Sequence, residues 1–187
     1  MEDLFDKWAS QPPKYDKIFE PLFDKLARKG SGTEEGKDDA GKIFSNNYEL
    51  YIYAFFIGLY LNKKTPIEGE KIDFSHEIKH WGKKGRQFDR KDYTILQQYM
   101  FMAIVAKSEV DFIEFENAEE SEIKKSVLQL RSEFAEFTNT GLLILQDQYD
   151  KDKLAFNDKS WFLHKILDIE VEQDYLTSVN SIIEAEY

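Results

Sequence analysis

Hydrophobic residues are most concentrated between Asn46 and Ile67, where the sequence reads NNYELYIYAFFIGLYLNKKTPI. From Tyr48 to Leu61 only Glu49 is charged, so apolar positions would cover every side of a helix. A bilayer-spanning helix needs about 20 apolar residues, and this run is shorter. The pattern therefore predicts a helix that is buried on nearly all sides at the centre of the fold, with Asn46 as its N-cap.

Weaker apolar stripes on either side of this segment predict a mainly α-helical chain. Pro21 suits the first turn of a helix that ends at Gly30, and Asp89 is the expected N-cap of another that runs to about Lys107. Gly141 stands where the C-cap of the clearest amphipathic helix is expected. The stripe of that helix consists of Ile123, Val127, Leu130, Phe134 and Phe137. We therefore expect a compact single-domain bundle of about five to seven helices around the buried central helix, with at most a minor β element.

Polar stretches mark the parts of this single domain, which spans residues 1–187. Residues 1–14 are polar and close with two prolines, which predicts a loose or a docking N-terminal tail. Residues 30–41 contain no large apolar side chain and are expected to form a flexible loop. A further short helix is expected over 160–168, and the acidic C-terminal segment 169–187 is expected to cross the body or to fray.

Charge is distributed unevenly along the chain. The net charge is −11, yet residues 79–91 hold six Lys or Arg and one acidic residue, a local charge of +5 that leaves −16 on the remainder. An acidic chain does not coat nucleic acid, because phosphate binding needs positive potential. The basic segment is therefore the predicted contact surface for DNA phosphates or for an acidic face of a protein partner. Its five central cations are Lys83, Lys84, Arg86, Arg90 and Lys91.

The setting of these cations suggests how they would bind. They lie in a glycine-containing stretch that leads into a helix N-terminus, where backbone N–H groups add to the positive charge. Trp81 and Phe88 are candidate stacking surfaces for bases. The alternative is a solvated loop whose cations only offset the acidic remainder of the chain.

The sequence HEIKH is the sharpest motif match in the chain. On an α-helix it places His76 and His80 on one face to share a zinc ion, with Glu77 as the base for the bound water. Lys79 puts a cation among these ligands, Gly82 limits the helix to about two turns, and no third ligand follows at the required spacing. We therefore predict a short surface helix without a bound metal, and keep a zinc-dependent hydrolase as the alternative.

Carboxylate pairs offer a second kind of hydrolase, a glycosidase with one acid and one base. The candidates are Glu119, Glu120, Glu122, Asp147, Asp150 and Asp152. With 36 Asp and Glu in 187 residues such pairs arise by chance, and none of them stands out. The chain has no cysteine, no phosphate-binding glycine loop and no serine nucleophile elbow, so we expect no cofactor.

Two passages carry a family resemblance. One is PLFDKLARKG followed by KIFSNNYELYIYAFFIGLYLNKKTPI, a short helix and then a long apolar helix that ends before a basic stretch and proline. The other is FAEFTNTGLLIL, residues 134–145. Over residues 15–150 the chain resembles small bacterial proteins associated with the DNA sulfur-modification (Dnd) system. Relatives with a glycoside-hydrolase label are also expected, and the carboxylates here give that label no support.

The resemblance implies a cytoplasmic accessory protein of a bacterial DNA-modification or phage-defence system, and it transfers no catalytic residue. The leading hypothesis is therefore a non-enzymatic binding protein that contacts a protein partner or DNA through the basic segment. We see neither a secretory signal nor a membrane span, and expect a cytoplasmic protein. A homodimer formed through the aromatic-rich helices is compatible with this hypothesis and with the hydrolase alternative.

Overall fold

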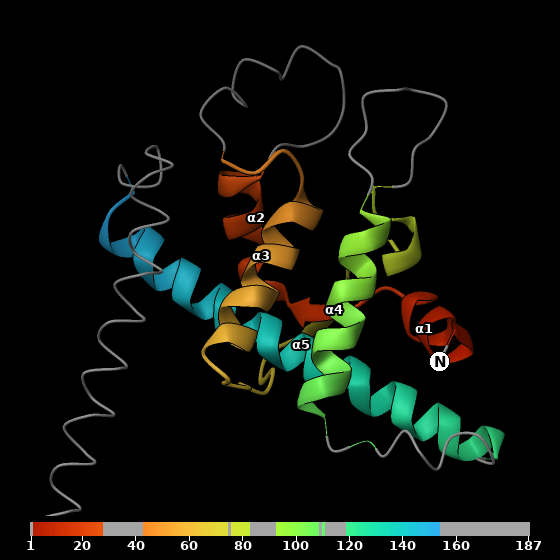
Figure 1. Ribbon diagram of the computed structural model, residues 1–187. Coiled ribbons are helices and arrows are strands. Elements are labelled where there is room, and N and C mark those ends of the chain that lie inside the picture. Colours follow the sequence, from red (N-terminus) through yellow and green to blue (C-terminus); the bar gives the residue numbers. More distant parts are fainter. Residues whose placement is uncertain are drawn as a thin grey trace, which may run out of the picture.

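The computed structural model describes residues 2–27, 43–74, 76–82, 93–108, 110 and 119–153. Within these ranges the chain folds into five α-helices, two short 3₁₀ turns and a two-stranded antiparallel sheet (Figure 1). The elements are α1 (Glu2–Ala9), β1 (Lys14–Asp16), η1 (Lys17–Phe19), α2 (Glu20–Leu26), α3 (Asn47–Tyr60), β2 (Lys71–Asp73), η3 (Ile78–His80), α4 (Thr94–Lys107) and α5 (Glu120–Lys151). The prediction of a mainly helical fold with at most a minor β element is confirmed. None of the helices in the described ranges is long and apolar enough to cross a membrane.

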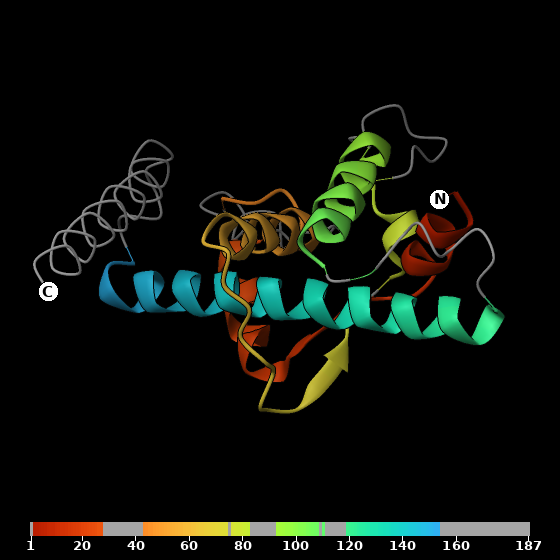
Figure 2. The same cartoon turned by 60° about the horizontal axis from the view of Figure 1, so that its bottom comes forward.

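The long helix α5 organises the molecule. With 32 residues it is about 48 Å long, and α3 and α4 lie on one side of it while β2 lies on the other (Figure 2). It packs against α1, β1, α3 and α4. Elements far apart in the sequence therefore share this one helix as their common partner.

The helices α3 and α5 cross at two glycines. A Cβ atom on Gly58 would overlap the carbonyl oxygen of Phe137, and one on Gly141 would overlap the carbonyl oxygen of Ala54. Each glycine thus lets its helix touch the backbone of the other. The prediction that Gly141 caps a helix is wrong, because α5 continues to Lys151. The glycine at this position allows the close approach of the two helices and does not end the helix.

Both ends of α3 are closed by asparagine. Asn46 is the N-cap, as predicted, and its side-chain oxygen accepts a hydrogen bond from the Glu49 N–H at 3.0 Å. After the helix, Asn62 adopts a left-handed conformation with φ of 48°. Its N–H donates to the carbonyl of Leu59, and the next N–H, of Lys63, donates to the carbonyl of Gly58. This pair of bonds is a Schellman ending, which satisfies carbonyls that the helix leaves unpaired.

The core is built from aromatic rings around the α3–α5 crossing, and α3 is buried along most of its length, as predicted. Phe134 of α5 lies at its centre. Its ring centroid is 4.6 Å from that of Phe55, 5.3 Å from that of Trp8 and 5.6 Å from that of Tyr51. All four side chains are at most 1% exposed. Three helices, α1, α3 and α5, therefore meet through one ring.

Of the two alternatives for residues 1–14, a loose or a docking tail, the structure shows docking for the part that it describes. Residues 2–9 form α1, and its Leu4 and Trp8 side chains are buried in the core. Behind α1, Arg131 of α5 donates hydrogen bonds to the carbonyl of Pro12, at 2.7 Å, and to the side chain of Gln11. Apolar residues four positions apart give α1 a buried face, and the arginine fixes the following turn.

The remaining predicted boundaries are shifted or lie outside the described residues. The helix that Pro21 opens is α2, which ends at Leu26 and so before Gly30. The helix expected after Asp89 is described from Thr94, and it ends at Lys107 as predicted. Asp89, the loop 30–41, the short helix 160–168 and the acidic segment 169–187 lie outside the described residues, so these expectations stay predictions.

A buried carboxylate joins β1 to the turn before β2. Asp16 is 5% exposed, and its two oxygens accept hydrogen bonds from the backbone N–H groups of Ile18 and Gly69, each at 3.1 Å. A Cβ atom on Gly69 would overlap this carboxylate, so the glycine is needed for the approach. Asp16 thus stabilises two turns that are far apart in the sequence.

Replacing Asp16 with alanine is expected to lower the free energy of unfolding by about 2 kcal/mol, since two backbone N–H groups, of Ile18 and Gly69, lose a charged acceptor. Urea denaturation measures this loss. Asp73→Ala is the matched control, because that carboxylate is 58% exposed in its pair with Lys14 and its loss is expected to stay below about 1 kcal/mol. Equal losses in the two variants would contradict the role assigned to Asp16.

Candidate functional site

The predicted contact residues Lys83, Lys84, Arg86, Arg90 and Lys91 lie outside the described residues, so their role stays a prediction. The structure does describe the two points from which this segment starts and ends. These points are Trp81 with Gly82 on one side and Tyr93 on the other. Gly82 adopts φ of 63°, a conformation in which glycine is favoured.

Both anchor points are fixed to the core beside the start of α3. The Tyr93 hydroxyl donates a hydrogen bond to Glu49 at 2.8 Å and accepts one from Asn46 at 3.3 Å. The side chain of Gln97, in α4, donates to the carbonyl of Trp81 at 2.8 Å. Burial, together with the hydrogen bond to Glu49, raises the pKa of Tyr93 to about 12, so this hydroxyl stays protonated and keeps donating. The described residues that flank 83–92 are thus both hydrogen-bonded to the body, and Gln97, one turn after Tyr93, links the two flanks.

The prediction that Trp81 offers a stacking surface to bases is wrong. Its side chain is fully buried, stacks on Tyr48 with ring centroids 5.2 Å apart, and donates a hydrogen bond from Nε1 to the carbonyl of His76 at 2.9 Å. The sequence alone does not show whether an aromatic residue next to cations is buried in the core or exposed on a binding surface. Phe88, the other candidate ring, lies outside the described residues.

The HEIKH segment does not form the α-helix that the zinc hypothesis requires. Ile78–His80 make a single 3₁₀ turn with Glu77 at its N-cap, so the four-residue spacing of the histidines does not correspond to one α-helical turn. Nδ1 of His76 shares a hydrogen bond with the Tyr48 hydroxyl at 3.0 Å. Across the described ranges, no group of three or more His, Cys, Asp or Glu side chains has the geometry to hold a metal ion.

The glutamate of this segment is also a poor base. Its carboxylate lies 2.7 Å from Nζ of Lys79 and 3.3 Å from Nε2 of His80. The Lys79 ammonium holds the pKa of Glu77 below its ordinary value. A carboxylate whose ionised form is stabilised in this way has little tendency to take a proton from water.

The predicted carboxylate candidates take part in the structure of α5 itself. Glu119 and Glu122 form the capping box at its start, with the Glu119 N–H donating to the Glu122 side chain at 3.1 Å. Near its end, Asp147 pairs with Lys151 at 2.6 Å and Asp150 accepts a hydrogen bond from Gln146 at 2.8 Å. The two groups thus lie at opposite ends of a helix about 48 Å long, and each helps to close a helix end or a turn.

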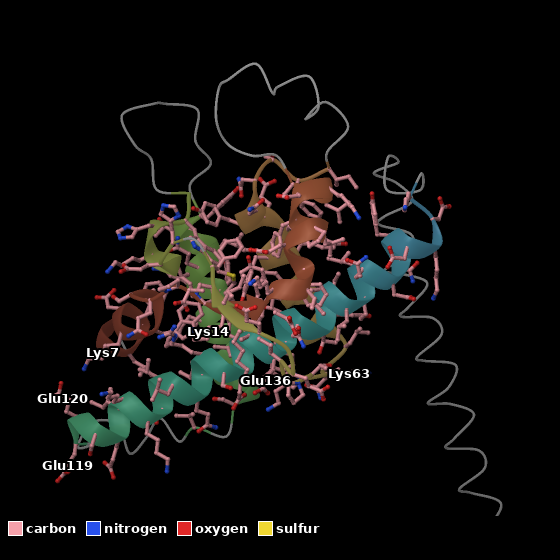
Figure 3. All side chains as sticks on the ribbon, turned by 180° about the vertical axis from the view of Figure 1, so that it is seen from behind. Lys7, Lys14, Lys63, Glu119, Glu120 and Glu136 are labelled. Carbon is pink, nitrogen blue, oxygen red and sulfur yellow. The ribbon has the colours of Figure 1, made fainter. Side chains whose placement is uncertain are left out.

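A pocket of about 550 Å³ that the sequence did not indicate opens between α1 and the first turns of α5. Lys7 and Glu120 stand on its two walls (Figure 3), and its lining also includes Asp6 and Lys124, so positive and negative charges balance. Ser10 lines it too, but its hydroxyl donates to the carbonyl of Asp6 at 2.6 Å. The lining offers polar contacts, and that serine proton is already engaged.

The outer face of α4 is the second feature that the sequence did not reveal. Ile95, Tyr99 and Met102 are 66%, 64% and 51% exposed. The side of this helix that is buried carries Gln97, Met100, Phe101 and Ile104. Because α4 is apolar on nearly every side, spacing alone does not decide which face points inward.

Comparison of the chain with protein-family models, with curated proteins and with solved structures found no match. The resemblance to proteins associated with DNA sulfur modification therefore stays a prediction.

Proposed function

We propose that this protein is a non-enzymatic binding protein that holds an anionic macromolecule at the basic segment 83–91, as an accessory to a bacterial DNA-modification or defence complex. The observations that support the proposal best are the local charge of +5 over residues 79–91 and the hydrogen bonds that tie two residues flanking 83–91, Trp81 and Tyr93, to the body. Five cations within nine residues of an otherwise acidic chain concentrate positive potential.

The expected ligand chemistry is that of phosphate or carboxylate groups. Duplex DNA carries regularly spaced phosphates, and each phosphate that a cation neutralises contributes to a steep dependence of affinity on salt. The acidic remainder of the chain, at −16, opposes extensive contact with DNA, so the contact is confined to the segment and its edges. An acidic face of a protein partner presents the same kind of charge.

Charge reversal tests this proposal. The triple variant Lys83→Glu, Lys84→Glu and Arg86→Glu is expected to abolish binding of a 20-base-pair duplex at low salt, measured by fluorescence anisotropy. The unchanged protein is expected to show an affinity that falls steeply with salt, by a factor that grows with the number of phosphates contacted. The melting temperature of the variant is expected to stay nearly unchanged.

A matched variant separates local from global charge effects. Lys107, Lys124 and Lys125 are exposed on α4 and α5, and reversing all three changes the net charge by the same amount. This control is expected to bind as the unchanged protein does. If the unchanged protein does not bind DNA, affinity capture is expected to yield an acidic protein partner. That partner is expected to be lost with the 83/84/86 variant and kept with the 107/124/125 variant. Retention of both ligands by the first variant would refute the proposal.

A further inference from the structure

The helix α1 packs against the body through one face. Leu4, Trp8 and Ala9 on that face are at most 4% exposed. Asp6 and Ser10, which the helical spacing places on the opposite side, line the pocket of about 550 Å³ between α1 and the first turns of α5. Because close packing stabilises a docked helix, this hollow leaves α1 less firmly attached than a helix that is packed on several sides.

Two aromatic rings of α1 supply much of its contact with the body. The Phe5 ring centroid is 5.5 Å from that of Phe101 in α4, and the Trp8 ring is 5.6 Å from Phe101 and 5.3 Å from Phe134 of α5. The Nε1–H of Trp8 is buried and meets no hydrogen-bond acceptor among the residues that the structure describes. This donor lowers the stability of the docked helix, because it would bond to water once the helix opens.

The chain between α1 and β1 forms a hinge with a clasp. Pro12 and Pro13 fix their own φ angles, and the Pro13 carbonyl accepts a hydrogen bond from the Phe74 N–H at 2.8 Å, so the freedom to rotate lies before the prolines. Arg131 of α5 closes this turn by donating to the Pro12 carbonyl and to the Gln11 side chain. Loss of these two hydrogen bonds would release the turn that carries α1.

α1 can leave the body without opening the α3–α5 crossing. A helix of eight residues is not stable on its own in water, so α1 unfolds when it undocks. The Phe134 ring keeps its contacts with Phe55 and Tyr51 in that state, since both belong to α3. Undocking α1 therefore costs less free energy than unfolding the whole chain, and it is a local opening of the kind that hydrogen exchange detects.

We propose that α1 is a latch that opens and closes separately from the rest of the fold. In the closed state it covers the rings of Phe101 and Phe134, and in the open state it exposes them as an aromatic surface on α4 and α5. The occupant of this surface is α1 of the same chain. Arg131 is a positioning residue, because its hydrogen bonds to the hinge favour the closed state.

Hydrogen exchange at two tryptophan side chains of the full chain tests the latch. Trp8 and Trp81 are both fully buried, but only Trp8 belongs to α1. We expect its Nε1–H to exchange at least about a hundredfold faster than that of Trp81 in an NMR measurement, because the opening of α1 releases Trp8 alone. Arg131→Met is expected to speed exchange at Trp8 about tenfold, and Gln11→Ala by a smaller factor, since the closed state loses hydrogen bonds to a charged donor.

A variant in the core is the matched control. Leu145, near the end of α5, is 3% exposed, and Leu145→Ala is expected to speed exchange at Trp81 at least about tenfold by making global unfolding easier. The same variant is expected to leave Trp8 unchanged, because Trp8 exchanges through a local opening that does not involve Leu145. Equal rates at the two rings, or an equal acceleration of both by Leu145→Ala, would show that α1 opens only with the whole protein. No acceleration at Trp8 in Arg131→Met would remove the clasp from the proposal.

Thiol labelling gives an independent readout, since the natural chain has no cysteine. Ala9→Cys places a thiol on the buried face of α1, and Ala135→Cys places one on α5, at positions that are 0% and 6% exposed. The Ala9→Cys protein is expected to react with a thiol reagent at least about a hundredfold faster, the reverse of the order that static exposure predicts. Faster labelling of the Ala135→Cys protein, or equal labelling of both, would overturn the proposal.

Discussion

Replacing Gly141 with alanine is expected to lower the free energy of unfolding by about 3–5 kcal/mol. The new Cβ would overlap the carbonyl oxygen of Ala54, which is backbone and has no rotamer into which to move. The helices α3 and α5 would have to separate, and the aromatic contacts around their crossing would loosen. Chemical denaturation followed by circular dichroism at 222 nm measures the loss.

The sign of this effect is diagnostic. In an unobstructed helix the same substitution is expected to raise stability by about 1 kcal/mol, because alanine is the better helix former. Lys125→Ala, at an exposed site on the same helix, is expected to change stability by less than about 0.5 kcal/mol. Gly58→Ala is expected to resemble Gly141→Ala, and the double variant to lose less than the sum, since one separation relieves both overlaps. A stabilised Gly141→Ala protein would show that the crossing is not tight.

Replacing Phe134 with alanine is expected to lower the free energy of unfolding by about 3–5 kcal/mol. The ring is fully buried and touches the rings of Trp8, Tyr51 and Phe55, so its removal leaves a cavity between three helices. The surrounding rings belong to different helices and cannot all move inward at once, which keeps the cavity open. Urea denaturation monitored by tryptophan fluorescence measures the loss.

Two further variants bracket this result. Phe134→Leu keeps most of the volume and is expected to lose about 1–1.5 kcal/mol. Leu128→Ala, which shortens a side chain that is 57% exposed on the same helix, is expected to lose less than about 0.5 kcal/mol. A Phe134→Ala protein that loses no more than Leu128→Ala would contradict the placement of this ring at the centre of the core.

The N-cap of α3 and the end of α4 were predicted correctly, because each depends mainly on residues next to it in the sequence. Asn46 was identifiable because an N-cap needs only its own side chain and the helix that follows, and the end of α4 at Lys107 was also found. Gly141 was misassigned because a glycine in a helix pattern marks an ending or a close approach equally well, and only the position of Ala54 decides between them. The choice between a loose and a docking tail was left open, although Leu4 and Trp8 are one helical turn apart and so indicate one apolar face.

The sequence predicted less of the candidate site than of the fold. The spacing of His76 and His80 places both rings on one face only on an α-helix, whereas the structure has a 3₁₀ turn there, followed directly by the buried Trp81. The exposed stripe on α4 was hidden because the buried side of that helix is equally apolar. The contact role of the cations in 83–91 stays a prediction from charge alone.

The position of α5 in the sequence has a consequence for synthesis on the ribosome. The partners of this helix, α1, α3 and α4, are all made before it, and the Trp8 and Phe55 rings have no Phe134 to pack against until residue 134 has been added. At about 5–20 residues per second, residues 61–151 take about 5–20 seconds to translate. During that interval the nascent chain exposes aromatic side chains that are buried in the folded protein. We therefore expect it to need chaperones, or to collapse late, more than a protein whose core forms from its N-terminal half alone.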